Sequence, residues 1–188
     1  MKRLTLALAG TALLSSAVQA ADQWTWLPIN EDNYQAQPSI AFLIGQLDPS
    51  GKLDNETVGG LELSFNCPLL QPPSNRIRQQ LSYTKYKKQG VEEIQNIELN
   101  PHYVVEISPG LEIGGGPGLG FVMVDRKGVG TGNVFAVQLG ASLHYHAKGP
   151  LFLGAEARYQ VTQKDNFGAA TKSNVNNTRI MIKVGYSL

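Results

Sequence analysis

The residues that could do chemistry in this 188-residue chain are acids, bases and histidines that recur at every second position of several segments. Side chains two positions apart leave the same face of an extended strand, so they would gather on one surface. The expected set is Glu62, Arg76, Arg78, Glu98, His102, Glu106, Glu112, His144, His146, Glu156, Arg158, Arg179 and Lys183. Five carboxylates would face five bases, which predicts a paired charge network if that surface is enclosed.

Metal binding is a sharper alternative for part of this set. His144 and His146 lie two positions apart on one predicted strand, with Glu156 diagonally across from His144. Strand spacing would let these side chains share an ion, but the sequence offers no third ligand close by. We therefore expect hydrogen-bonded histidines in a polar interior, and we predict no metal, no cofactor and no catalytic residue.

The stretch 134–162 shows most clearly which elements must position these residues. It reads VFAVQLGASLHYH, AKGP and LFLGAEARYQVT, and both arms place apolar residues at odd positions. Each arm is about twice the usual length of a soluble strand, about 5–6 residues. About 9–11 tilted residues are needed to cross a bilayer. The alternation therefore predicts transmembrane strands with apolar residues toward lipid and polar residues inside.

The same pattern extends over eight segments of the chain. We expect strands at about 39–47, 58–68, 76–87, 94–107, 111–124, 134–146, 151–162 and 177–188. The first is apolar on both faces, so its pattern does not assign its register. An open sheet edge in hydrocarbon would leave backbone groups unpaired, which favours closure. The predicted fold class is all-β: an eight-stranded antiparallel up-and-down transmembrane β-barrel.

The connections between these segments predict its orientation. Short connections at 69–74, 108–110 and 148–150 would lie on the periplasmic side. Longer or more polar ones at 48–57, 88–93, 125–133 and 163–176 would be extracellular. Pro101 and Pro117 fall opposite each other in mid-strand, where proline cannot donate a hydrogen bond. We expect a local bulge there, with the glycines of the fifth strand absorbing the bend.

The N-terminal segment has the pattern of a cleavable export signal. Lys2 and Arg3 precede an apolar core at 4–14, and Val18-Gln19-Ala20 forms a small-residue cleavage site. An anchor helix is the alternative, but the core is too short. We predict a signal peptide at 1–20, an irregular periplasmic lead-in at 21–38 and the barrel at 39–188. Trp24 and Trp26 in the lead-in would lie at the membrane interface or pack under the barrel.

Composition argues against a nucleic-acid-binding protein and against a fold stabilised by internal disulfides. The chain has 16 Lys+Arg against 15 Asp+Glu, so no net positive field favours nucleic acid. Its one cysteine, Cys67, cannot form an internal disulfide.

Three stretches carry a resemblance to a known family: GLEIGGGPGLGFVMVD, FAVQLGASLHYHAKGPLFLGAEARYQ and NTRIMIKVGYSL. They resemble strands 5 to 8 of the small eight-stranded outer-membrane β-barrel proteins, a group that includes the OmpA transmembrane domain and related bacterial surface antigens. The resemblance covers about residues 94–188 well, and the first three strands only by pattern. It implies a location in the bacterial outer membrane. Such motifs are architectural and specify fold rather than activity.

We expect a non-enzymatic integral outer-membrane barrel with a plugged, charged lumen, acting as a surface or envelope structural or interaction protein. Its extracellular loops, the loop 163–176 above all, would make the contacts. One alternative is a narrow gated channel for ions or small solutes. Another is a lipid A deacylase-like enzyme. That family carries a His-x-Ser element on a strand, whereas this chain has His144-Tyr145-His146 and lacks the serine.

The expected partners follow from this location. They are outer-membrane lipid and lipopolysaccharide, the barrel-assembly machinery during insertion, and an extracellular ligand or host surface. We expect a monomer.

Overall fold

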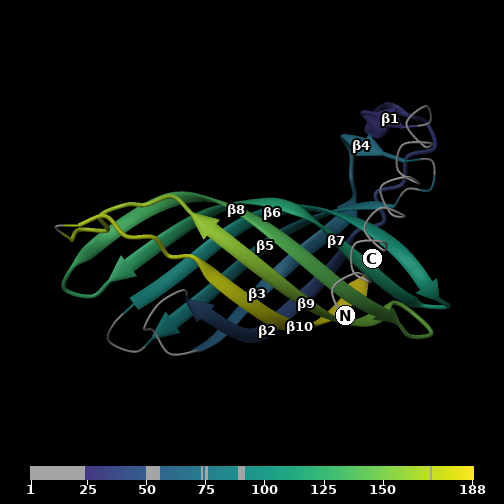
Figure 1. Ribbon diagram of the computed structural model, residues 1–188. Coiled ribbons are helices and arrows are strands. Elements are labelled where there is room, and N and C mark those ends of the chain that lie inside the picture. Colours follow the sequence, from purple (N-terminus) through teal and green to yellow (C-terminus); the bar gives the residue numbers. More distant parts are fainter. Residues whose placement is uncertain (1–23, 50–55, 73, 75, 89–91, 170) are drawn as a thin grey trace, which may run out of the picture.

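The computed structural model describes residues 24–49, 56–72, 74, 76–88, 92–169 and 171–188. Eight of the strands in these ranges form one closed antiparallel barrel, in which each strand pairs with its neighbour in the chain and β10 pairs with β2 (Figure 1). They are β2 (Ser39–Pro49), β3 (Glu56–Asn66), β5 (Ile77–Lys88), β6 (Glu92–Ser108), β7 (Leu111–Arg126), β8 (Gly130–His146), β9 (Leu151–Thr162) and β10 (Asn177–Ser187). The predicted fold class is confirmed.

The strand bounds differ from prediction mainly at the ends. β6, β7 and β8 extend to 16 or 17 residues and reach beyond their predicted ends. β3 ends at Asn66, so Cys67 lies outside the strand, although the predicted range 58–68 included it. Cys67 is buried, and its backbone N–H donates to the Ile77 carbonyl at 2.8 Å. Two turns were predicted to have three residues each. The turn between β6 and β7 has two, and the turn between β8 and β9 has four.

The barrel closure fixes the register that the sequence left open in the first strand. Leu43 of β2 pairs with Lys183 of β10 on one side and with Gly60 of β3 on the other. Lys183 is fully buried inside the barrel, so the odd positions of β2 also point inward. Phe42 consequently faces outward, with 69% of its surface exposed.

The mid-strand prolines interrupt the ladder without inserting a residue. The Leu99–Leu119 and Tyr103–Gly115 pairs flank Pro101 and Pro117, and each strand advances by four residues between them (99 to 103, 119 to 115). The predicted bulge at the prolines is therefore wrong. Instead, Gly116 lets the two backbones approach, because a Cβ there would overlap the Pro101 carbonyl. The register shift between β6 and β7 lies nearer the turn, between Glu106 and Ser108.

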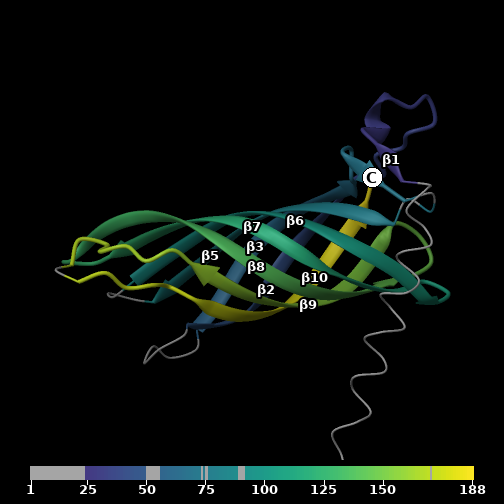
Figure 2. The same cartoon turned by 45° about the horizontal axis from the view of Figure 1, so that its top comes forward.

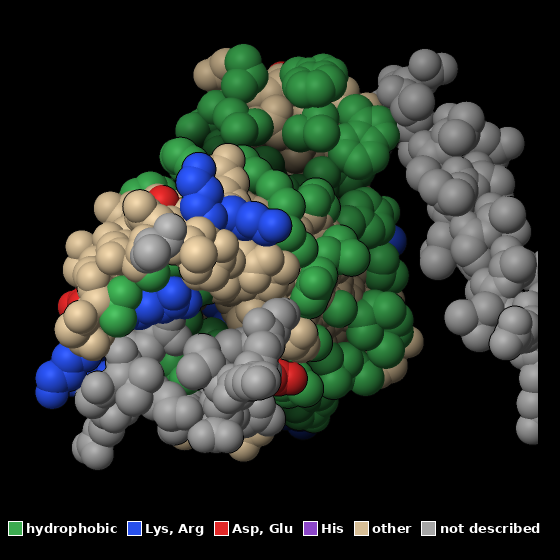
Figure 3. Space-filling view, turned by 60° about the vertical axis from the view of Figure 1, so that its left-hand side comes forward, with side chains coloured by type: hydrophobic (Ala, Val, Ile, Leu, Met, Phe, Trp, Pro, Cys, Tyr) green, Lys and Arg blue, Asp and Glu red, His purple; other side chains and the backbone are tan. Residues whose placement is uncertain are grey.

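Side chains are distributed in the opposite sense to a soluble protein. Leu119, Leu139 and Ile180 are 63–66% exposed on the outside, whereas Arg158, Arg179 and Lys183 are at most 2% exposed inside. Figure 3 shows the hydrophobic side chains gathered over the barrel wall. Water would disfavour this outer surface and a bilayer core favours it, so the barrel spans a membrane. In the described part of the chain, no helix is long and apolar enough to cross a membrane.

The two ends of the barrel differ. The β6–β7 and β8–β9 turns lie at one end, here called the turn end, which corresponds to the periplasmic side in such barrels. The loop 163–176 and the β7–β8 connection lie at the other, here called the loop end (Figure 1).

A small appendage projects from the turn end (Figures 1 and 2). It consists of residues 24–37 and 67–72. Within it the two-residue strand β1 (Thr25–Trp26) pairs with β4 (Leu70–Gln71), and the 3-10 helix η2 spans Pro28–Asn30. The sequence predicted an irregular lead-in, whereas the structure has a short strand and a 3-10 helix within it. The predicted signal peptide at 1–20 lies outside the described residues.

Candidate functional site: the barrel lumen

Four charged side chains from three strands meet at the centre of the lumen. Lys183 Nζ of β10 lies 2.8 Å from both carboxylate oxygens of Glu62 on β3, and 2.7 Å from Glu156 Oε2 on β9. Arg158, two residues from Glu156 on the same face of β9, donates to it from Nε at 2.9 Å and from Nη2 at 3.0 Å. Arg158 Nη2 also lies 3.7 Å from Glu62. These four groups form one buried network with balanced charge.

A second pair, Glu98 of β6 and Arg179 of β10, lies farther toward the loop end. Arg179 Nη2 donates to Glu98 and, at 3.0 Å, to the Gln138 amide oxygen, while its Nη1 donates to Thr84 at 3.0 Å. Gln160 donates to Glu98 at 3.3 Å. The predicted site set omitted these neutral partners, although all three lie on the inward face that alternation defines. They supply the hydrogen bonds that a buried ion pair requires.

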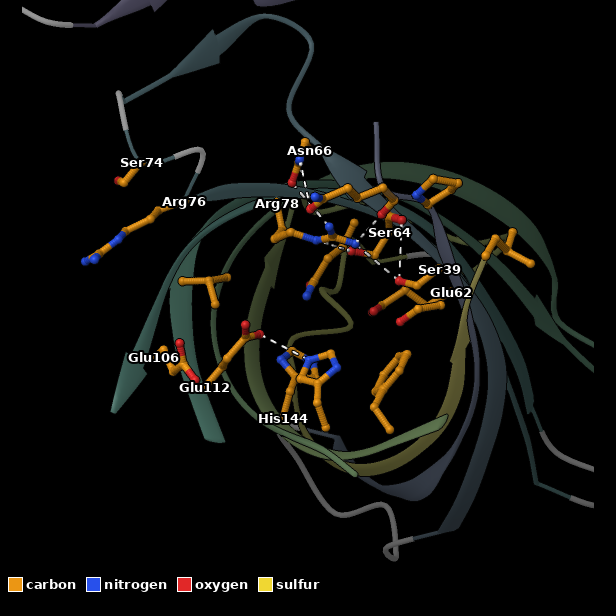
Figure 4. A pocket seen from close by; sticks show the side chains of 18 residues that line it. Ser39, Glu62, Ser64, Asn66, Ser74, Arg76, Arg78, Glu106, Glu112 and His144 are labelled. Atoms are coloured by element: carbon orange, nitrogen blue, oxygen red, sulfur yellow. Dashed lines mark hydrogen bonds and ion pairs between the residues drawn. The ribbon is translucent and has the colours of Figure 1, made fainter. Parts of the chain in front are cut away.

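The structure brings the middle of the expected lumen set together and leaves its ends apart. Of the thirteen predicted residues, the two clusters above contain Glu62, Glu98, Glu156, Arg158, Arg179 and Lys183, which is three acids against three bases. Arg76 lies before β5 and points away from the barrel (Figure 4). Glu106 is exposed near the β6–β7 turn, where its Oε1 accepts the Gly110 N–H at 2.9 Å. Both lie at strand ends, where a side chain with the inward phase is no longer surrounded by the barrel wall.

The lumen opens at the turn end into a cavity of about 570 Å³ (Figure 4). Arg78 reaches across its rim, donating to Ser64, Asn66, Ser39 and the Gln37 carbonyl. On the opposite wall, Glu112 lies 3.3 Å from His146 Nε2. Glu112 pairs with Glu106 across the β6–β7 hairpin. The cavity ends at Glu62, Gln80 and His144, against the central network.

The three histidines occupy different surroundings. His144 and His146 flank the Phe152 ring, with centroids 5.9 and 5.3 Å away. His102 is buried, and its Nδ1 lies 3.1 Å from the Ser142 hydroxyl. A Ser–His pair is the usual start of a nucleophilic site, but neither residue lines the cavity and no carboxylate hydrogen-bonds His102. Among the described residues, no three His, Cys, Asp or Glu side chains lie close enough to hold a metal ion.

Toward the loop end the interior contains a large apolar cluster, which the sequence analysis did not predict, with the buried amides of Asn96 and Asn177 among it. Twelve buried side chains form this apolar layer: Leu43, Leu47, Val58, Tyr86, Ile94, Val122, Val124, Val134, Ala136, Phe167, Val175 and Met181. The expectation of a wholly polar interior is therefore wrong. The sequence does contain a signal for this apolar interior, because Val58, Tyr86 and Val122 continue the inward alternation of their strands toward the loop end.

The loop 163–176 covers this layer. Asp165 and Ser173 form an isolated antiparallel bridge that folds the loop back on itself. Phe167 at its tip is fully buried, and the Arg126 guanidinium stacks over its ring at 4.9 Å from the centroid. Lys164 and Lys172 remain exposed. The loop predicted to make surface contacts therefore also acts as a lid.

A closed wall, an apolar outside and a filled interior define an integral membrane β-barrel of the eight-stranded type. Its fold is that of the small bacterial outer-membrane β-barrel proteins, as solved structures show. Neisserial surface protein A is similar with a TM-score of 0.63 and 14% identity, over 80% of this chain and 96% of that one. Ail, the attachment invasion locus protein of Yersinia pestis, is similar with a TM-score of 0.50 and 15% identity, over 80% and 96%. No protein-family model and no curated protein sequence matches the chain.

Proposed function

We propose that this protein is a non-conducting, non-enzymatic barrel of the bacterial outer membrane that acts as a surface or envelope interaction protein through its loop end. One observation carries the proposal: the lumen is filled by a charged network and by an apolar layer that extends from it toward the loop end. The central charge network lies next to the turn-end cavity, and the apolar layer under the loop 163–176 lies beyond it.

Each layer opposes permeation for its own reason. An ion that entered from the turn end would have to displace Lys183 or Arg158 from carboxylates held at 2.7–2.9 Å. Removing one partner of a buried ion pair costs about 3–5 kcal/mol. An ion that passed this layer would meet side chains such as Val122 and Phe167, which offer no hydrogen bond to replace its water. A permeating ion would have to overcome both free-energy costs, one after the other.

The lumen chemistry also favours a protein without catalytic activity. The Ser142–His102 pair is enclosed by the wall and does not line the cavity. A lipid substrate would approach from the outside, where the described surface of the mid-barrel carries leucine, isoleucine, valine and aromatic side chains.

The loop end presents exposed charges that a partner outside the cell would meet. Lys127, Lys164 and Lys172 are exposed there. The loop that carries Lys164 and Lys172 is held in place by the buried ring of Phe167. A fixed loop with exposed charges loses little conformational entropy when it binds a partner. Ail, one of the similar structures named above, is an attachment invasion locus protein, which is in keeping with a role at the cell surface.

Planar-bilayer recording tests the proposal. The purified protein should give no conductance steps, while heat-modifiable gel mobility on the same sample confirms a folded barrel. Steps that disappear in Arg158→Ala or Arg179→Ala would establish the narrow channel instead.

A second measurement addresses the enzyme alternative. Expression in a bacterial host should leave the mass of lipid A unchanged. A mass shift that is lost in Ser142→Ala or His144→Ala would overturn the non-enzymatic part of the proposal.

A further inference from the structure

The appendage at the turn end carries an apolar patch that the barrel does not cover. The patch consists of Trp26, Leu27, Ile29 and Leu69, which are 76%, 49%, 56% and 59% exposed. Exposed apolar groups gathered on a small element usually mark a contact with a partner or a membrane. The patch lies outside the lipid-facing wall, so the membrane span does not account for it.

The appendage is held firmly to the barrel. The Gln71 side chain is buried and bonds both backbone groups of Ile77, accepting its N–H at 3.0 Å and donating to its carbonyl at 2.6 Å. The Tyr34 hydroxyl donates to the Asn66 carbonyl at 2.6 Å, and the Asn66 amide donates to the Gln35 carbonyl at 2.8 Å. Burial raises the pKa of the Tyr34 phenol, so it remains a neutral donor near pH 7. The patch therefore has a set position relative to the wall.

That position is beside the barrel at the level of its turn end. Figures 1 and 2 show the appendage displaced sideways from the wall in both views, at the end that holds the short turns. Figure 3 is turned so that the loop end comes forward, and it shows hydrophobic side chains on the visible side of the appendage, at the top of the view. The appendage follows the end of β3, whose outer face carries Leu61, Leu63 and Phe65.

We propose that the patch is an interfacial anchor that inserts into the phospholipid head-group region of the leaflet at the turn end. Indole is favoured at this depth, because its ring is apolar while its N–H can reach water or a head group. Residues 24–37 and 67–72 contain no Lys or Arg, while Glu31 and Asp32 are exposed. Attraction to anionic lipid therefore plays no part, and binding rests on apolar burial alone.

The chain is well suited to a direct test, because its two tryptophans both lie in the appendage. Trp24→Phe leaves Trp26 as the single reporter. In protein folded into phospholipid vesicles, Trp26 emission should shift to shorter wavelength. Bromine atoms near the glycerol end of the acyl chains should quench it more than bromine at the chain ends. Acrylamide in the water phase should quench it weakly, and neutral and anionic vesicles should give the same result in low or high salt.

A matched pair of variants in the Trp24→Phe background gives the control. Ile29→Asp places a charge in the patch and should return Trp26 emission toward that of tryptophan in water. Asn33→Asp adds the same charge at an exposed position outside the patch and should leave the emission unchanged. Heat-modifiable mobility of each variant shows whether the barrel has folded, independently of the appendage.

Two results would overturn the anchor. One is Trp26 emission at long wavelength in vesicles, with full acrylamide quenching and no bromine quenching. The other is shielding of Trp26 that appears only after a periplasmic protein fraction is added, which would make the patch a protein-docking surface. Neither result bears on whether the lumen conducts.

Discussion

Lys183 Nζ on β10 lies 2.8 Å from both carboxylate oxygens of Glu62 on β3, although 121 positions separate the two residues in the chain. Their strands are not neighbours, because β2 lies between them. The bond therefore crosses the inner face of β2, at the level where Leu43 pairs with Lys183. It links the strand that closes the barrel to the second strand of the wall, and both side chains are at most 3% exposed.

The first prediction concerns this bond. Lys183→Met should destabilise the folded barrel by about 3–5 kcal/mol, because Glu62 and Glu156 would lose their shared cation in a buried site. Urea unfolding in vesicles, followed by heat-modifiable mobility, measures the change. Lys148→Met removes the same charge from an exposed turn and should stay within about 0.5 kcal/mol. Equal effects of the two variants would contradict the central role of the network.

The second prediction concerns the unpaired stretch of β6 and β7. In Gly116→Ala the new Cβ would overlap the Pro101 carbonyl, so the backbones must separate, at about 1–3 kcal/mol. Gly59→Ala is the control, because its Cβ would find its nearest neighbour, the Leu43 carbonyl oxygen, at 3.8 Å. Unfolding in urea should separate the two variants clearly. If Gly116→Ala proves as stable as Gly59→Ala, the close approach at the prolines has little energetic weight.

The third prediction concerns the lid. Phe167→Ala should release the loop 163–176, because it removes a fully buried ring and its stacking with Arg126. Trypsin should then cut after Lys164 and Lys172 at least about tenfold faster, which corresponds to about 1.4 kcal/mol of lost local stability. Val129→Ala, a change at a half-exposed apolar residue of the neighbouring connection, should leave the cleavage rate nearly unchanged. A rate that Phe167→Ala fails to raise would mean that other contacts hold the loop.

The fourth prediction concerns the two layers together. Arg179→Ala opens space in the charged layer but leaves the apolar layer closed, so bilayer recordings should still show no steps. Combining it with Phe167→Ala removes part of both blocks and should produce small conductance steps. If Arg179→Ala conducts by itself, the apolar layer is not a barrier, and if the double variant stays closed, other side chains fill the path.

Local patterns predicted the wall of the barrel closely. β9 begins and ends at the predicted residues, 151 and 162, and β10 differs from its predicted range by one residue. This succeeds because the alternation of side chains between faces is a property of each strand alone. The inward direction of Glu62, Arg158 and Lys183 follows from the same rule, and each of them is buried as predicted.

The ends of the strands were predicted less well. Arg76 and Glu106 have the inward phase, yet they lie at the rim of the barrel and are exposed to solvent. The appendage combines residues near 25 with residues near 70, and its two-residue strands are too short to show a period. No local pattern indicates that Gln71 will bond the backbone of Ile77, because that bond depends on where β3 and β5 end.

Along the middle of every strand except β2, the sequence by itself thus determined which side chains face lipid and which face the lumen, because a strand imposes that choice every two residues. Only the tertiary structure decided which of the inward side chains meet. The tilt and closure of the strands set the height of each residue in the lumen, and they bring Glu62 to Lys183 and Glu98 to Arg179. The same heights place the charged network next to the turn-end cavity and most of the apolar layer beyond it, under the loop 163–176.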